Sequence, residues 1–195
     1  MTSDVRAAKA ALRRRHRAAR AERSPQVRAA AGLALQAAAA VVFEPVDPAL
    51  TVTAYAAVDA EPPTDELLEA LRRRGVRVLL PVLAENRQLD WAAYAGPSAL
   101  ARSAHGLREP TGPRLGAAAL QEADVVLVPA LAVDRRGTRL GQGGGYYDRA
   151  LAGPPRAALV LAVVYDEEVV DTLPVEAHDV SVGGALTPGG VHRFI

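Results

Sequence analysis

The glycine-rich stretch Asp134–Arg149, with the sequence DRRGTRLGQGGGYYDR, is the part of the chain whose residue types best suit chemistry. It follows an apolar run, Val125–Val133, that is typical of a buried strand. Fixing glycine costs conformational entropy, so such a cluster predicts a turn where the backbone approaches a ligand. Successive free N–H groups there, and those of a helix expected from Tyr146, would favour phosphate. The clustered glycines, within five residues, are Gly141, Gly143, Gly144 and Gly145.

Charged side chains flank this glycine turn. Arg139 and Arg149 supply cations on either side, and Asp148 supplies a hard oxygen ligand suited to Mg²⁺. The stretch is not a Walker A loop, because no Lys-Ser/Thr pair follows the last glycine, and Tyr146 replaces the third glycine of a GxGxxG motif. A flexible surface loop between strand and helix is the alternative. The residues alone therefore predict a phosphate-binding turn with a metal-capable aspartate.

The longer run VPALAVDRRGTRLGQGGGYYDR resembles the signature of the 5-formyltetrahydrofolate cyclo-ligase family, also called 5,10-methenyltetrahydrofolate synthetases. The resemblance extends over nearly the whole chain. It implies an enzyme that uses ATP and Mg²⁺ to convert 5-formyltetrahydrofolate to 5,10-methenyltetrahydrofolate, releasing ADP and phosphate. The γ-phosphoryl group would go to the formyl oxygen, and N10 would then close the ring.

An N-terminal helix is expected over Val5–Arg23, with arginines on most of its faces. Lys9 is the only lysine of the chain, and Arg13 lies four residues later on the same side of the helix. A solvated basic face is one interpretation. A nucleic-acid arm is another, weakened because no aromatic residues are interleaved for base stacking. A third is contact with a polyphosphate, and the family's Lys-x-x-Leu-Arg element implies that Lys9 and Arg13 contact the nucleotide.

Two further acidic positions are candidates. Glu61 lies at a strand-to-helix junction, where open α/β sheets place ligands, although a solvated loop carboxylate is the alternative. The family uses a glutamate at this junction to hold the pterin ring, which a carboxylate can do by accepting two N–H donors. His178 and Asp179 could form a catalytic dyad, but no serine or cysteine nucleophile is placed to use it. The resemblance assigns magnesium to Asp179 together with Asp148, and leaves His178 without a role.

The residue-level interpretation and the resemblance together imply a complete set of roles. Catalytic roles fall to Lys9, Arg139 and Tyr146, and substrate binding falls to Glu61 and Tyr146. Asp148 and Asp179 are the metal ligands. The nucleotide would be bound by Lys9, Arg13, Arg139, Leu140, Gly141, Gln142, Gly143, Gly144, Gly145, Tyr146 and Tyr147.

Alternating strands and helices predict an α/β domain with three layers, α/β/α, and a mainly parallel sheet, preceded by two N-terminal helices. Ser24 and Pro25 should start the second helix, and Thr64 should cap the third. Turns are expected near Glu44–Pro48 and at Gly153–Pro155, and Gly106–Pro110 resembles a family element that shapes the site wall. The expected strands are Leu50–Val58, Val76–Leu83, Gln88–Tyr94, Asp124–Val133, Ala157–Tyr165 and Val180–Leu186, and the remaining helices are Asp65–Arg74 and Leu115–Ala123.

Composition limits the number of domains and the classes of partner that the chain can have. The chain of 195 residues suggests one domain spanning 1–195, and its net charge of +1 gives no strong pull toward nucleic acid or membrane. There is no cysteine, and apolar runs such as Ala37–Phe43 are far below the roughly 20 residues of a membrane span. We expect a cytoplasmic monomer that binds folate and ATP, with no nucleic-acid or membrane partner. An ATP-binding regulator or another phosphate-handling enzyme on the same scaffold, and a basic nucleic-acid-binding protein, are the alternatives.

Overall fold

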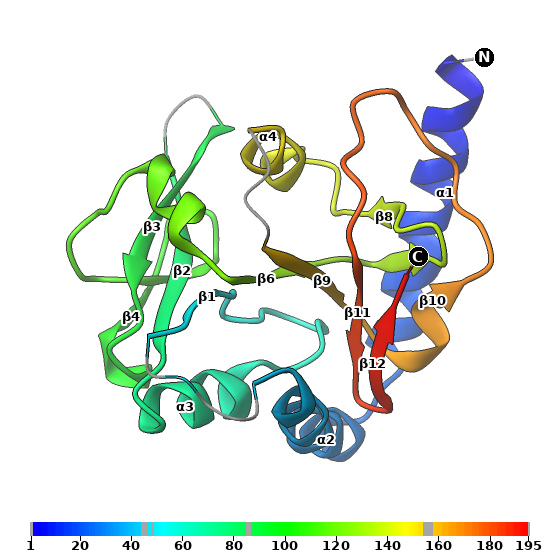
Figure 1. Cartoon of the computed structure of the whole chain (residues 1–195). Coiled ribbons are helices and arrows are strands. Elements are labelled where there is room, and N and C mark those ends of the chain that lie inside the picture. Colours follow the sequence, from blue (N-terminus) through cyan, green and yellow to red (C-terminus); the bar gives the residue numbers. More distant parts are fainter. Residues whose placement is uncertain (1, 44–46, 48, 85–86, 154–157, 195) are drawn as a thin grey trace.

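The computed structural model describes the chain except for residues 1, 44–46, 48, 85–86, 154–157 and 195. The turns expected near 44–48 and 153–155 fall mostly outside the described residues. A seven-stranded sheet runs through the centre of the molecule, in the order β12-β11-β9-β6-β1-β2-β3 (Figure 1). Its strands are β1 (Thr51–Thr53), β2 (Arg77–Leu83), β3 (Leu89–Ala93), β6 (Val125–Pro129), β9 (Leu159–Val163), β11 (Gly184–Thr187) and β12 (Gly190–Arg193).

The five inner strands of this sheet are parallel, and both edge strands are antiparallel. β6 and β9 lie next to each other in the middle, where both faces of a strand are covered, which explains their nearly continuous apolar sequence. β12 was not expected. It forms a hairpin with β11 through the turn at Pro188 and Gly189, and it lies at the edge of the sheet.

Helices cover both faces of the sheet, which confirms the predicted three-layer arrangement. α2 (Pro25–Phe43) and α3 (Asp65–Arg73) lie on one face and contribute Leu35, Phe43 and Leu67 to one core cluster (Figure 1). α4 (Tyr146–Leu151) and a 3-10 helix (Ala117–Glu122) pack into the cluster on the other face. Leu115–Ala123 is thus a shorter and tighter helix than expected. Trp91 is buried in this second cluster as a packing residue.

Helix α1 (Thr2–Ala21) stands beside the sheet rather than on it (Figure 1). Its Leu12 packs against a small cluster on a second sheet of three short strands, in the order β10-β7-β8. A two-stranded sheet completes the fold. The strands of these two sheets are β7 (Ala132–Asp134), β8 (Arg139–Leu140) and β10 (Val169–Val170), and β4 (Leu100–Arg102) and β5 (Arg108–Pro110).

The single strand predicted for Asp124–Val133 is wrong, because the chain leaves the main sheet after Pro129. Proline has no N–H to continue the ladder. Leu131 instead donates its N–H to the carbonyl of Leu140, and the chain continues as β7 in the second sheet. The break changes the direction of the chain directly before the glycine turn. The predicted strands Leu50–Val58 and Val180–Leu186 are likewise shorter, as β1 and β11.

Of the two predicted helix caps, that of Ser24 is confirmed and that of Thr64 is wrong. Ser24 caps α2 as predicted, because its Oγ accepts a hydrogen bond from the N–H of Val27 at 3.2 Å. Thr64 precedes α3, but its side chain does not cap that helix. Its hydroxyl instead donates to the carbonyl of Tyr55 at 2.7 Å and accepts from the N–H of Ala57 at 3.0 Å. Thr64 therefore ties the segment after β1 to the start of α3.

α2 is a described helix that is long and apolar enough, by length and composition alone, to cross a membrane. The count of uninterrupted apolar residues had missed this property. A core helix of a soluble protein passes the same test. α2 buries Gly32, Leu35, Ala39 and Phe43 against the sheet and α3, as a core helix does. The helix is therefore weak evidence for a membrane location.

Replacing Thr64 by valine tests its tie to the segment after β1. The change keeps the shape of the side chain and leaves a buried carbonyl and a buried N–H without their partner, so we expect a loss of about 2 kcal/mol in the free energy of unfolding. Urea denaturation measures it. Thr111→Val is the matched control, because its exposed hydroxyl bonds only to the carbonyl of Ala99 and should cost less than about 0.5 kcal/mol. Equal losses in the two variants would contradict the assigned role.

Candidate functional site

A cavity of about 700 Å³ opens where the parallel strands end. Tyr55 follows β1, Leu83 ends β2 and Pro129 ends β6, and all three line this cavity. Ligands of open α/β sheets bind at this carboxyl edge. The cavity brings together almost every residue that the sequence singled out. They are Lys9, Arg13, Glu61, Arg139, Gly141, Gln142, Gly143, Gly144, Gly145, Tyr146, Tyr147, Asp148 and Asp179.

Leu140 is the one predicted site residue that is not on the cavity wall. Its side chain is 1% exposed and packs with Leu131 and Leu173 in the small cluster beneath α1. It lies in β8, where alternate side chains point to opposite faces. Arg139 faces the cavity, so its neighbour Leu140 faces the core.

Arginine side chains of α1 donate hydrogen bonds to carbonyl groups of the glycine turn. Arg13 donates from Nε to the carbonyl of Gly141 at 2.9 Å, and Arg17 donates to the carbonyl of Gln142 at 3.0 Å. No described residue accepts a hydrogen bond from the N–H groups of Gly143, Gly144 or Gly145. A turn with bound carbonyls and open N–H groups is suited to an anion.

Backbone geometry explains why these positions are glycine. Gly143 has φ +106° and Gly145 has φ +67°, a region that other L-residues rarely adopt. A Cβ on Gly144 would lie 2.8 Å from the ring of Tyr146. α4 begins directly after Gly145 and has only six residues, so its dipole adds little to what the turn supplies.

Lys9 is buried, with 4% of its surface exposed, and it lies between two carboxylates. Its Nζ donates to Asp179 Oδ2 at 2.5 Å and to Glu176 Oε2 at 3.0 Å. The hydrogen bond from Lys9 is the main reason that the pKa of Glu176 lies below its ordinary value. Arg6 adds a second contact to Glu176, at 3.2 Å. The lysine and one predicted metal ligand therefore form an ion pair in the protein.

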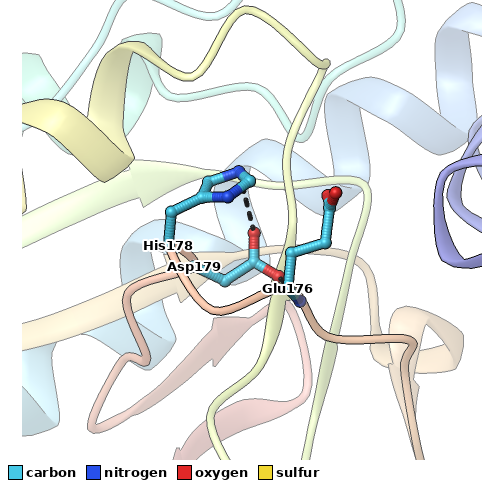
Figure 2. Close-up of side chains that lie close together, drawn as sticks. All are labelled: Glu176, His178 and Asp179. Carbon is cyan, nitrogen blue, oxygen red and sulfur yellow. Dashed lines mark hydrogen bonds and ion pairs between the residues drawn. The ribbon is translucent and has the colours of Figure 1, made fainter. Parts of the chain in front are cut away.

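Asp179 has neighbours that could share a metal ion with it. Figure 2 shows the side chains of Glu176, His178 and Asp179 on the loop before β11, and their ligand atoms lie within 4.8 Å of one another. His178 Nε2 is 4.0 Å from Asp179 Oδ1. Asp148 is not in this group. It accepts a hydrogen bond from Arg139 Nη2 at 2.6 Å instead.

Arg139 is a second buried cation that lines the cavity. It is 6% exposed, and among the described residues its Nε has no hydrogen-bond partner. Its guanidinium lies 6.0 Å from the centre of the Tyr147 ring. A buried guanidinium that keeps an unused donor has capacity for a further anionic ligand.

Glu61 lies in a polar corner of the cavity with two tyrosines. Its Oε2 accepts a hydrogen bond from the N–H of Val58 at 3.1 Å, and burial raises the pKa of the carboxyl above its ordinary 4.5. The hydroxyl groups of Tyr55 and Tyr147 are buried, and no described residue bonds to them. Burial also raises the pKa of both phenols, so they remain neutral donors. These groups can orient a polar ring edge.

Several cavity residues escaped the sequence analysis. Arg6 lies three residues before Lys9, and Glu176 lies three before Asp179, so helical spacing and proximity were available signals. Tyr55 was placed inside a longer strand, which hid its position at a strand end. Leu107 and Arg108 line the cavity as the element at 106–110 led us to expect, but nothing marked Arg108 itself.

These features define an α/β protein with a cation-lined pocket at the carboxyl edge of a mainly parallel sheet, as found in proteins that bind phosphorylated ligands. Residues 5–188 match the model of the 5-formyltetrahydrofolate cyclo-ligase family. This chain belongs to the 5-formyltetrahydrofolate cyclo-ligase family, and it is therefore a ligase-type enzyme.

Individual relatives agree with this assignment. The 5-formyltetrahydrofolate cyclo-ligase of Mycolicibacterium smegmatis is 48% identical over 71% of this chain and 73% of its own length. The Escherichia coli protein of the same name is 33% identical over 79% and 86%. The solved structure of Aquifex aeolicus 5,10-methenyltetrahydrofolate synthetase has a TM-score of 0.76 at 27% identity, covering 95% of this chain and 92% of that one.

The raised pKa of Glu61 predicts a pH-dependent stability. Because the folded-state pKa lies above the unfolded value, this carboxyl favours folding most below pH 4.5 and opposes it as pH rises through the folded pKa. Glu61→Gln removes the ionisation. The free energy of unfolding of this variant should therefore increase relative to wild type as pH rises from about 4 to about 7.

Urea denaturation at several pH values measures that difference. Glu66→Gln, on the exposed side of α3, reports the effect of removing a surface carboxylate. A difference between Glu61→Gln and wild type that stays constant or shrinks with rising pH would contradict the assigned burial effect.

Proposed function

We propose that the protein converts 5-formyltetrahydrofolate to 5,10-methenyltetrahydrofolate while ATP is split to ADP and phosphate. The relatives named above carry the names of this activity. The observation that carries the proposal is that one cavity holds the glycine turn with its open N–H groups, several cationic side chains including Lys9, Arg13 and Arg139, and the Glu61 carboxyl beside neutral tyrosines. The first two features suit a triphosphate, and the third suits the pterin ring.

ATP fits the cationic side of the cavity. Gly143, Gly144 and Gly145 offer N–H groups, and Lys9, Arg13 and Arg139 offer positive charge to phosphate oxygens. The free Nε of Arg139 supports the same assignment. Phosphoryl transfer depends mostly on positioning and charge stabilisation, which explains a site with many donors and few nucleophiles.

A magnesium ion fits the carboxylates near the turn. We propose Asp148 and Asp179 as its ligands, with Glu176 close enough to take part. Oxygen ligands suit this ion, and when bound it would draw charge from the phosphate oxygens. In the protein these carboxylates are compensated by Arg139 and Lys9. Metal and nucleotide together could replace both internal ion pairs without leaving an unpaired charge.

The reaction explains why these groups are needed. A formamide carbonyl is a poor electrophile because its nitrogen donates electrons into it, and its oxygen leaves poorly. Transfer of the γ-phosphoryl group to that oxygen produces an iminium-like carbon and a good leaving group. N10 attacks this carbon, the C–O bond breaks with its electron pair leaving on phosphate, and the proton of N10 passes to that phosphate. Lys9 and Arg139 would hold the transferred group, while Glu61 with Tyr55 and Tyr147 would hold the pterin in line.

Tyr146 would border the formyl group or pack on the folate. Its ring lies on the cavity wall, 5.3 Å from the guanidinium of Arg149. The single domain, the monomeric state and the cytoplasmic location expected from the sequence stay predictions. Three of the inward residues of α1, Lys9, His16 and Arg20, are buried in the protein, which weakens the alternative of a nucleic-acid arm.

The direct test is an assay of the purified protein with 5-formyltetrahydrofolate, Mg²⁺ and ATP, read as methenyl-folate absorbance in the near ultraviolet. Lys9→Ala and Asp148→Asn should each reduce turnover by more than about tenfold, because each removes a charge that positions the phosphates. Arg73→Met, on the exposed end of α3, is the control and should keep wild-type turnover.

Circular dichroism and melting curves would show whether the variants remain folded. Wild-type protein that binds ATP without forming methenyl-folate would overturn the proposed reaction. Wild-type rates in both variants would leave the reaction standing and remove the assigned roles of Lys9 and Asp148.

A further inference from the structure

Helix α1 is attached to the rest of the protein mainly by charged side chains. At 3.6 residues per turn, Lys9, Arg13, His16 and Arg20 lie on one side of the helix. Lys9, His16 and Arg20 are 4%, 6% and 2% exposed, whereas Leu12 is the partly buried apolar residue that packs beside them. An apolar stripe normally fixes a helix against its neighbours. Here the position of the helix depends on where its cations find partners.

Arg20 makes the most complete of these contacts. Its Nε and Nη2 donate to the two carboxylate oxygens of Glu168, both at 2.7 Å, and Nη2 also donates to the carbonyl of Ala130 at 2.6 Å. Glu168 is 2% exposed, and its Oε2 also accepts a hydrogen bond from the N–H of Tyr165 at 2.9 Å. A bidentate pair of this kind constrains both distance and orientation.

The partners of Arg20 belong to the segments that build the cavity. Ala130 follows Pro129, where the chain leaves the main sheet on its way to the glycine turn. Glu168 and Tyr165 belong to the connection after β9. Neither Arg20 nor Glu168 lines the cavity, so this pair makes no contact with a ligand bound there and positions it through the elements that the pair joins.

Arg20 and the two cavity-facing cations lie on the same rigid helix. Arg13 and Lys9 lie seven and eleven residues before Arg20, or about 10 and about 16 Å along the axis at roughly 1.5 Å per residue. Whatever fixes the rotation of the helix at Arg20 also fixes the direction of Lys9 and Arg13, which face the cavity. Lys9 and Arg13 line the cavity, where a ligand can exchange their contacts, whereas the Arg20–Glu168 pair lies outside it and is available as a constant anchor.

We propose that the Arg20–Glu168 ion pair is the positioning device that holds α1 so that Lys9 and Arg13 face the triphosphate of ATP. This inference rests on the proposed function for the identity of the nucleotide. Arg20 is a positioning residue, since it touches no ligand. The pair is expected to affect the use of ATP selectively and to leave the use of the folate nearly unchanged.

Loss of one partner of a buried ion pair destabilises a protein by itself, so the test needs a variant without an unpaired charge. Arg20→Met combined with Glu168→Met replaces both groups by apolar side chains, and it is studied beside Arg20→Met and Glu168→Gln. Arg14→Met is the matched control, because it removes the same charge from the exposed side of the same helix. Melting curves identify the variants that fold.

Three quantities are measured for each folded variant: the KM for ATP, the KM for 5-formyltetrahydrofolate, and the Kd of inorganic tripolyphosphate by calorimetry. In the double variant we expect the KM for ATP and the Kd of tripolyphosphate to rise by about fivefold or more, with the KM for the folate changing less than about twofold. Arg14→Met should change each of the three by less than about twofold.

Equal increases in both KM values would assign the pair a general structural role and overturn the inference. Unchanged ATP and tripolyphosphate values in the double variant would overturn it as well. If the wild-type protein forms no methenyl-folate, the proposed function is wrong instead. The inference about Arg20 is then tested by the Kd of tripolyphosphate alone, compared between the wild type and the double variant.

Discussion

The site depends on the docking of one basic helix onto the α/β body through ion pairs. Only one lysine exists in this chain, and α1 carries it to a position between Asp179 and Glu176. Charges pay a desolvation penalty when buried, so Lys9 and Arg20 are tolerated there because each has carboxylate partners. Helix α1 thereby adds to the cavity a wall that the sheet alone does not provide.

The sheet supplies the other walls through the ends of its parallel strands. β1, β2 and β6 stop at the same edge, which places Tyr55, Leu83 and Pro129 around one opening. The departure of the chain after Pro129 then carries the glycine turn across that opening, where arginines from α1 hold its carbonyls. Fixing a carbonyl also orients the next residue's N–H, because the two groups share one planar trans peptide and point in opposite directions.

The cavity is also arranged so that its charges compensate one another before any ligand arrives. Asp148 is paired with Arg139, and Asp179 is paired with Lys9. An anion and a divalent cation entering together could exchange these pairs for new ones, so the protein need not keep isolated buried charges in either state. The neutral corner formed by Tyr55, Tyr147 and a carboxyl of raised pKa differs from this charged side, which suits ligands of different chemistry.

The sequence by itself determined the layered fold and the glycine turn, because helical and strand periodicity and glycine clusters are local properties. The roles expected for Glu61 and Asp179 came from its resemblance to the family. It also placed Lys9 and Arg13 on one side of a helix. Only the tertiary structure decided that Asp148 pairs with Arg139, that Glu176 joins Asp179, that Leu140 turns into the core, and that Arg20 meets Glu168. Arg20 and Glu168 lie 148 residues apart, so their contact is set by packing of the whole chain. Arg139 and Asp148 are only nine residues apart, but whether these two side chains meet depends on the path of the turn between them, which local preference does not give.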